Sequence, residues 1–443
     1  MIRRLPKTAW IALATVALAA ACGERCLPNR VVAAPASPTS DARLERIDVR
    51  LSRASKFLAA GQSSDGAWRS DVYATFRHGD ALTPLVLMAL VSIRGHDQNA
   101  TAIDKAADYL AGLVHKDGTV QSPEQPLTYP VYASAGAVIA LANRSGRNVE
   151  AARGAWLAYL RRLQLTESLG WQPDDACYGG WGYAGDPPQK PSSGQPLSPL
   201  AEPNLSATAF ALSALRAAGV AGDAPEVQKA LRFLRRCQNF ALDPDQRDGS
   251  FDDGGFFFIP SDPVRNKAGS VGTDRLGRER FASYGSATVD GLRALVMCGM
   301  PNDEPRAVAA WQWLAQNFSA QAHPGRYAAS RESARQAVYY YYCHSLAELL
   351  ADPHAQTATK GVNKCRWAEA IADELLERQG PDGSWRNSAV DVREDDPLVA
   401  TSLATSALAL CRGVIMVESA ATRAAVDHDD RAHHPNPTAE PSR

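Results

Sequence analysis

The sequence predicts an all-α protein, an (α/α)6 toroid in which six helical hairpins form two concentric rings. The first observation is a repeated phrase, Phe57-Leu58 … Gln62 … Asp65-Gly66-x-Trp68, which returns near the C-terminus as Leu375-Leu376 … Gln379 … Asp382-Gly383-x-Trp385. The second is that weaker copies lie between these two, and that an alanine-rich apolar segment follows each copy. A supersecondary unit repeated at intervals of tens of residues is typical of stacked units that share one core.

Each unit is expected to begin with an amphipathic outer helix. In residues 102–113, for example, the apolar side chains recur at the spacing of one helical face. A turn that contains glycine follows each outer helix, because glycine adopts positive φ angles without a steric penalty. The expected outer helices end near Phe57-Leu58, Tyr109-Leu110, Tyr159-Leu160, Phe233-Leu234, Trp313-Leu314 and Leu375-Leu376.

Each unit is expected to end with a more apolar inner helix that is rich in Ala, Ser and Thr. A helix that is apolar on every face is packed on every side, and small residues allow its neighbours to approach closely. These segments are therefore predicted to form an inner ring. They cover residues 82–93, 131–142, 206–217, 286–298, 337–350 and 397–411.

The N-terminus is expected to be a signal peptide, residues 1–21. Basic residues precede an apolar segment, residues 10–21, which ends in three alanines. About twelve apolar residues are too few to cross a bilayer, which takes roughly twenty. Cys22 follows directly, and its surroundings resemble a bacterial lipoprotein box, so lipidation of Cys22 and simple secretion both stay open. The protein is expected to be exported, either to the periplasm, as a membrane-anchored lipoprotein, or out of the cell.

The rest of the chain is expected to be one domain with two flanking segments. Residues 22–42, rich in Pro, Ala and Ser, are predicted to be a flexible linker, residues 43–415 the toroid, and residues 416–443 the end of the last helix and a disordered tail. No other segment is expected to cross a membrane. The formal net charge of −1, without a basic block, gives no reason to expect nucleic acid as a partner. No cofactor is predicted, and the oligomeric state is left open.

The repeated phrase resembles the QW motif of squalene and oxidosqualene cyclases, which also occurs in the β-subunits of protein prenyltransferases. The resemblance covers residues 43–415 and implies the fold of this terpenoid cyclase-like superfamily. In that superfamily the glutamine and the tryptophan tie the outer helices together. The resemblance therefore implies structural roles for four residues: Gln62, Trp68, Gln379 and Trp385.

The acid that the cyclases use is missing at the corresponding position. Their Asp-x-Asp-Asp-Thr-Ala motif aligns with Asn204-Leu205-Ser206-Ala207-Thr208-Ala209, which contains no acid. Among the inner-helix starts compared with this motif, only the last has acids close by, Glu394-Asp395-Asp396 just upstream. Asp395 or Asp396 is a candidate proton donor. The favoured interpretation is that Asp396 caps the helix, with Pro397 at its first position.

A second set of candidates lies on the fifth inner helix. Tyr341, Tyr342 and His344 could form an acid–base pair of the kind found in toroidal polysaccharide lyases. The alternative is an aromatic layer that fills the ring, with its hydroxyl groups satisfied. Asp175-Ala176-Cys177 has the local spacing of the prenyltransferase zinc ligands, but the order of residues around His344 departs from that family, so no metal site is predicted.

The loop at residues 174–183 could be a binding lip beside the expected cavity, because functional loops are common on rigid scaffolds. Its candidate ligand-binding residues, together with one before the fourth inner helix, are Asp175, Tyr178, Trp181, Tyr183 and Tyr284.

Three functions remain open, since toroids host several chemistries. One is a cyclase-like protein that binds an apolar or isoprenoid ligand in the cavity. The others are an enzyme acting on polysaccharide and a non-catalytic envelope scaffold. Both enzyme hypotheses require the segments 174–183, 284–290, 338–344 and 394–398 to converge on one pocket.

Overall fold

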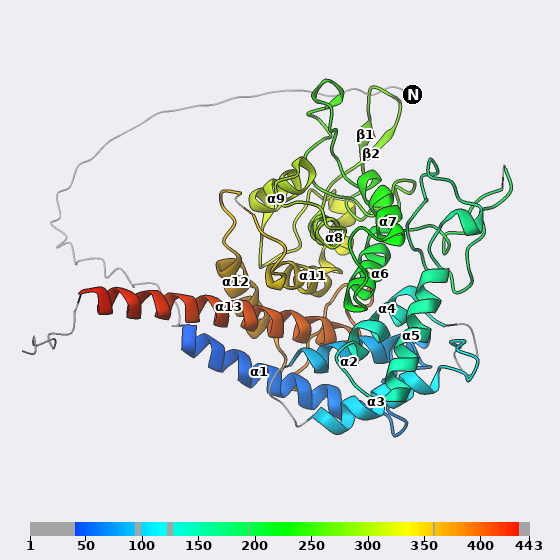
Figure 1. The fold of residues 1–443 in the computed structure, drawn as a ribbon. Helices are drawn as coiled ribbons and strands as arrows, with labels where there is room; N and C mark the ends of the chain where they lie inside the picture. The colour runs from blue at the N-terminus through cyan, green and yellow to red at the C-terminus, as the bar shows by residue number, and fades with distance from the viewer. Residues whose placement is uncertain (1–39, 94–98, 122–126, 194, 358, 434–443) are drawn as a thin grey trace, which may run out of the picture. The chain divides into compact units, whose positions relative to one another are not determined.

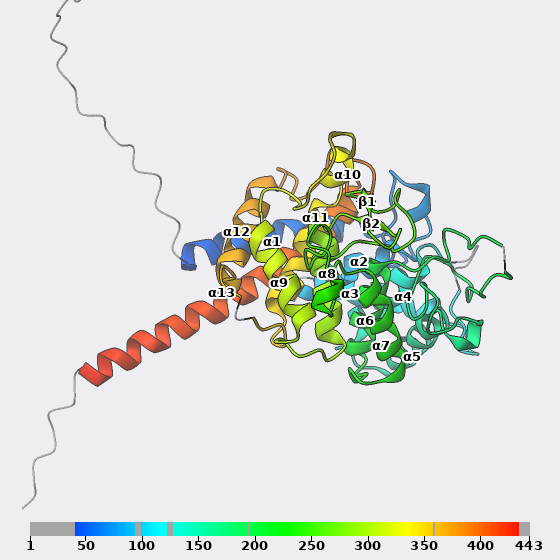
Figure 2. The same ribbon diagram turned by 90° about the horizontal axis from the view of Figure 1, so that it is seen from above.

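Apolar helices form a closed inner ring in the computed structural model, which describes residues 40–93, 99–121, 127–193, 195–357 and 359–433. Consecutive members pack against each other, and the last packs against the first, which closes the ring (Figures 1 and 2). Its six helices within these ranges are α2 (Leu82–Ser92), α4 (Pro130–Leu141), α6 (Leu205–Ala217), α8 (Gly285–Met297), α11 (Tyr339–Ala351) and α13 (Pro397–His433).

Amphipathic helices form an outer ring, and each precedes an inner helix along the chain. In α1, Ile47, Leu51, Ala54 and Leu58 are buried at helical spacing, so one face packs inward. Helix α5 packs on α4, α9 on α8, and α12 on α13. The predicted α/α toroid is thus confirmed. The outer helices in the described ranges are α1 (Ser40–Ala60), α3 (Ala100–Gly112), α5 (Arg147–Arg162), α7 (Pro225–Arg236), α9 (Pro305–Asn317) and α12 (Lys364–Arg378).

A glutamine–tryptophan clasp, defined by the residues of the repeated phrase, joins successive outer helices. The Gln62 side-chain amide donates to the carbonyl oxygen of Gly66 at 3.0 Å and to that of Ala102, at the start of α3, at 2.8 Å. The Trp68 indole donates to the Leu58 carbonyl at the end of α1. The same contacts recur in the last unit, where Gln379 reaches Gly383 and Arg50 of α1, and Trp385 reaches Leu375.

The clasp is also present where the sequence phrase is degenerate. Gln164 donates to Gly179 and Glu226, and Gln238 donates to Gly254 and Arg306. Gly179 has a φ angle of +89°, and a Cβ atom there would lie 1.9 Å from the carbonyl oxygen of Lys229. Glycine is therefore required at this position both by the backbone conformation and by the close approach of α7.

A long insertion separates α7 from α8. It carries a two-stranded antiparallel hairpin, β1 (Ser270–Thr273) and β2 (Glu279–Phe281). Within the described ranges the short elements also include the helix α10 (Glu332–Gln336) and the 3-10 turns η1 (Ala74–Phe76), η3 (Glu167–Leu169), η4 (Pro244–Gln246) and η5 (Ala329–Arg331).

Helix α13 is longer than the sequence pattern indicated. It continues beyond the fully buried Ile415 to His433 and leaves the ring (Figures 1 and 2). The helix is therefore continuous over residues for which a disordered tail was expected. From Pro397 to Ala421 it is long and apolar enough to cross a membrane, but 72% of its most apolar window is buried inside the protein. The predicted signal peptide, Cys22, most of the predicted linker and residues 434–443 lie outside the described residues.

Candidate functional site

A cavity of about 410 Å³ occupies the centre of the ring, and every inner helix contributes to its wall. The four segments expected to converge do so: Tyr183, Tyr284, Tyr341 and Glu394 all line this cavity. Side chains therefore do not fill the centre of the ring, whereas a purely structural scaffold is expected to have a filled ring. Apolar residues of α2, α4 and α13 complete the wall; they are Leu82, Leu85, Met88, Gly136, Val399 and Leu403.

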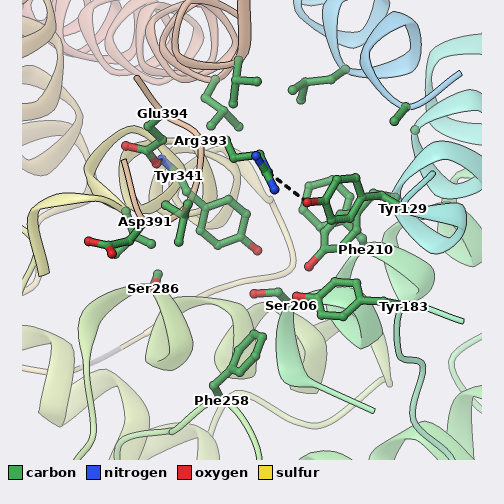
Figure 3. Close-up of a pocket in the computed structure, with 18 of the residues that line it drawn as sticks. Tyr129, Tyr183, Ser206, Phe210, Phe258, Ser286, Tyr341, Asp391, Arg393 and Glu394 are labelled. Carbon is green, nitrogen blue, oxygen red and sulfur yellow. Dashed lines mark hydrogen bonds between the residues drawn. The ribbon is translucent and has the colours of Figure 1, made fainter. Parts of the chain in front are cut away.

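Aromatic side chains form a belt in the wall of the cavity. In Figure 3, Tyr129, Phe210 and Tyr183 lie on one side and the carboxyl groups of Glu394 and Asp391 on the other, with the Tyr341 ring between them. The rings of Tyr132 and Tyr183 are stacked with centroids 5.9 Å apart, and Phe210 meets Tyr132 edge-on at 5.0 Å. Such contacts add to the stability gained by burial alone. The members of the aromatic belt are Phe76, Tyr129, Tyr183, Tyr132, Phe210 and Tyr341.

Two strained residues meet on the wall of the cavity. Tyr129 and Arg393 have φ angles of 49° and 68°, and they are the non-glycine residues with positive φ in the described ranges. The Arg393 guanidinium donates to the Tyr129 hydroxyl at 3.0 Å (Figure 3) and lies over the ring of Tyr73, 4.4 Å from its centroid. Backbone strain of this kind is concentrated at functional sites. The contact joins the loop before α4 to the loop before α13.

Glu394 is the acid of the predicted trio that reaches the cavity. Its carboxyl oxygens accept hydrogen bonds from the backbone N–H groups of Tyr341 at 2.7 Å and Tyr340 at 2.9 Å, in the first turn of α11. The Asn387 side chain donates to it at 3.1 Å. Burial raises the pKa of Glu394 to about 7, although the two backbone N–H groups act in the opposite direction.

Asp395 and Asp396, the predicted donors, are not on the cavity wall. Asp396 accepts a hydrogen bond from the backbone N–H of Leu398 at 2.8 Å, the contact expected of a residue that caps α13. Asp395 accepts a hydrogen bond from the Tyr73 hydroxyl at 2.7 Å. Of the three carboxyl groups in this segment, only that of Glu394 lines the cavity.

Lys267, from the insertion before α8, places a cation at the cavity wall. Its ammonium lies 4.6 Å from the centroid of the Phe258 ring, which also lines the cavity. Burial lowers the pKa of Lys267 to about 8, while the charges of Asp290 and Glu394 act to raise it. Sequence inspection did not single out Lys267, because an isolated lysine in a long loop carries no local signal.

A buried polar network lies behind Tyr341. The Tyr341 hydroxyl donates to the Asp290 carboxylate at 2.7 Å, and Ser345 and Ser206 donate at 2.7 and 3.1 Å. Burial raises the pKa of Asp290, which the charge of Arg293 and these hydroxyl groups partly offset. Asp290 was also missed as a candidate, although an acid within an otherwise apolar inner helix was a usable signal.

The other members of the Tyr/His candidate set lie outside the cavity. The Tyr342 hydroxyl donates to the Ser319 carbonyl at 3.1 Å. His344 is 2% exposed, and neither ring nitrogen has a hydrogen-bond partner within the described part of the chain. Its Nε2 atom lies 3.8 Å from a Glu348 carboxyl oxygen, and burial lowers the pKa of His344. Tyr341 alone of this set faces the cavity.

The 174–183 loop contributes only Tyr183 to the cavity wall. The Trp181 indole donates to the Leu160 carbonyl at 2.9 Å and is fully buried, so it has the contacts of a clasp tryptophan. Tyr178 donates to Glu167 at 2.6 Å, and Asp175 pairs with Lys190 at 2.7 Å. Among the described residues no group of three or more His, Cys, Asp or Glu side chains could hold a metal ion.

No protein-family model matches the chain, and no curated protein matches it. The solved structure of the type II terpene cyclase MstE from Scytonema has a TM-score of 0.49, with 15% sequence identity, and the match covers 84% of this chain and 99% of that chain. A protein from Actinoplanes has a TM-score of 0.48, with 18% identity over 83% of this chain and 99% of that chain. The GH76A α-1,6-mannanase from Salegentibacter sp. HEL1_6 has a TM-score of 0.49, with 10% identity over 84% of this chain and 99% of that chain. The ring and the clasp support the resemblance to the superfamily at the level of the fold. The likeness to the three solved structures assigns no activity to this protein.

Proposed function

We propose that this protein binds an apolar ligand of isoprenoid type in the central cavity. The observation that carries the proposal is the aromatic belt, which lies in the wall of a cavity enclosed by the inner ring. A volume of about 410 Å³ falls within the range of small-molecule sites, roughly 300–1,000 Å³. Extended aromatic faces match a long, unsaturated hydrocarbon chain better than they match a hydrated sugar.

Binding without cyclisation fits the state of the carboxyl groups. Protonation of an alkene requires a stronger acid than an ordinary carboxyl group, whereas Glu394 has a pKa raised to about 7 and is therefore a weaker acid. Asp290 accepts hydrogen bonds from three hydroxyl groups and is not on the cavity wall. Neither group is arranged as a strong proton donor to a ligand.

The polysaccharide alternative calls for an open, basic groove near His344. Arg331 and Arg335, which would supply its positive charge, have other partners. Arg331 donates to the Asn266 carbonyl at 2.9 Å, and Arg335 pairs with Glu332. Since His344 is itself buried, no described residue gives this alternative a specific supporting observation.

We further propose that the protein acts outside the cytoplasm. The basis is the N-terminal pattern, in which basic residues, an apolar segment and Cys22 follow one another. Palmitate labelling of cells that express the full chain, compared with a Cys22→Ser variant, separates a lipid-anchored protein from a secreted one.

Solvent extraction of the purified protein, followed by untargeted mass spectrometry, tests the main proposal. A bound isoprenoid or other apolar molecule is expected in the extract. Titration of the stripped protein with geranylgeraniol, which displaces the neutral fluorophore N-phenylnaphthylamine, gives the affinity. An empty extract together with no displacement would overturn the proposal.

A cavity-filling variant makes this test specific. Leu85 lies on the wall, so Leu85→Trp places an indole in the cavity and is expected to weaken geranylgeraniol binding at least about tenfold. Val49, 55% exposed on α1, provides the matched control, because Val49→Trp adds an indole on the outer surface. Equal affinities for the two variants would place the ligand elsewhere.

A further inference from the structure

Lys267 brings a positive charge to the cavity without a partner for it. Its side chain is partly buried and lines the cavity, where its closest recorded contact is the face of the Phe258 ring. No hydrogen bond or ion pair reaches its ammonium from the residues that the structure describes. An unpaired cation in an apolar setting costs free energy, and in folded proteins such a charge is normally paired.

The carboxyl groups around the cavity do not supply that partner. Glu394 accepts three N–H donors, and Asp391 accepts a hydrogen bond from Ser333. The Asp290 carboxylate accepts a hydrogen bond from the Tyr341 hydroxyl. The charges of Asp290 and Glu394 act on Lys267 from a distance, but neither group is bonded to it. The protein therefore satisfies each acid separately and leaves the ammonium available.

The other cation on the cavity wall is already engaged. Arg393 donates to the Tyr129 hydroxyl and lies over the Tyr73 ring, so its position is fixed by the protein. One available positive charge suits a ligand with a single negative charge. A diphosphate, with its higher charge, would meet one free cation together with the carboxyl groups of Glu394 and Asp391.

A second donor without a partner lies on the same wall. The Tyr284 hydroxyl is buried and has no hydrogen-bond partner among the described residues. Its ring lies 5.8 Å from that of His323, and Tyr284 and Lys267 both line the cavity. Two unsatisfied donors beside an apolar wall are suited to an oxyanion joined to a hydrocarbon chain.

We propose that the ligand is an isoprenoid carboxylic acid, whose carboxylate is bound by the Lys267 ammonium while its apolar chain lies along the aromatic belt. This inference rests on the proposed function, since it names the class of molecule that the same cavity takes. The role of Lys267 is recognition of the ligand head group.

Competition against N-phenylnaphthylamine tests the inference with three probes that share one hydrocarbon chain: geranylgeranoic acid, geranylgeraniol and geranylgeranyl diphosphate. The wild-type protein is expected to bind the acid about ten- to a hundredfold more tightly than the alcohol. Lys267→Met is expected to remove this preference and to leave the alcohol affinity unchanged. Lys267→Arg, which keeps the charge, is expected to retain part of the preference.

Lys190→Met is the matched control, because Lys190 is exposed on a loop and pairs with Asp175 away from the cavity. Retained alcohol binding by Lys267→Met also shows that the variant is folded. If the alcohol binds but the acid binds no better, or if Lys267→Met keeps the preference, the inference about Lys267 is wrong. If the diphosphate binds more tightly than the acid, the inference that the ligand carries a single negative charge is wrong. If no probe binds to the wild type, the proposed function itself fails.

Discussion

Replacement of Glu394 by glutamine should change how the stability of the protein depends on pH. Glu394, in the loop before α13, is buried against the first turn of α11, and its pKa is raised from 4.5 to about 7. Glutamine has nearly the same shape but does not titrate. The variant loses at least one acceptor for the N–H groups of Tyr340 and Tyr341, so it should be less stable than the wild type at low pH.

The sign follows from proton linkage. An acid whose pKa is higher in the folded state binds its proton more tightly there, so its contribution to stability is complete below a pH of 4.5. That contribution is lost as the pH rises toward about 7. With about 1.4 kcal/mol per pKa unit, the loss between about pH 5 and about pH 8 amounts to roughly 2 to 3 kcal/mol.

The difference between the two proteins is the informative quantity. His323 acts in the opposite direction, since burial lowers its pKa from 6.5 to about 3 and its contribution to stability grows as the pH rises through that window. Urea denaturation gives the free energy of unfolding of the wild type and of Glu394→Gln at both pH values. The contribution of His323 is common to the two proteins, so it cancels to first order in the difference between them. The stability advantage of the wild type should shrink by roughly 2 to 3 kcal/mol from about pH 5 to about pH 8.

A control variant defines what would refute the reasoning. Glu377 is 75% exposed and pairs with Arg46 on the surface, so Glu377→Gln should show the same pH dependence as the wild type. If the difference between wild type and Glu394→Gln is the same at both pH values, Glu394 is ionised across the whole range. Its carboxylate would then be a fixed negative charge beside the ligand, and the argument from its raised pKa would fail.

The clasp gives two further predictions, both measured by urea denaturation. Gly179→Ala should cost about 3 kcal/mol or more, because it combines a positive φ with a clash, whereas Gly219→Ala, which has a φ of +81° and open space around it, should cost only about 1 to 2 kcal/mol. Equal costs would show that α7 does not approach Gly179 closely. Gln238→Ala should cost about 1 to 3 kcal/mol through its two lost carbonyl contacts, and an unchanged midpoint would refute this role.

The fold could be predicted from the sequence because its determinants are local and repeated. An apolar helix rich in small residues and a glutamine–glycine–tryptophan phrase are visible without any long-range information. The prediction of the repeats was least accurate where an insertion lengthens the spacing between the glutamine and the tryptophan of one clasp. Trp181 looked like part of a binding lip because it lies 17 positions after Gln164, yet the two complete one clasp.

The site could be predicted only in part, because its members come from different units. Tyr284 and Tyr341 were found because each lies at a recognisable helix start, and Tyr183 because it ends the glycine-rich loop at residues 174–183. Lys267 and Tyr129 belong to connecting segments and have no periodic context. Whether Glu394 or one of its two neighbours points into the ring depends on the backbone path into α13, which composition does not reveal.

The missing acid and the unpaired lysine have a common explanation. In four units a threonine in the first turn of the inner helix accepts the backbone N–H of the clasp residue, as Thr208 does for Trp181 and Thr401 for Trp385. The start of each of these helices is therefore fixed by the clasp, and its geometry does not depend on an acid beside the threonine. The residues that line the cavity take no part in these contacts, so they are available to a ligand. Lys267 and Tyr284 leave donors unsatisfied in that interior, which folding alone does not explain and a bound carboxylate would.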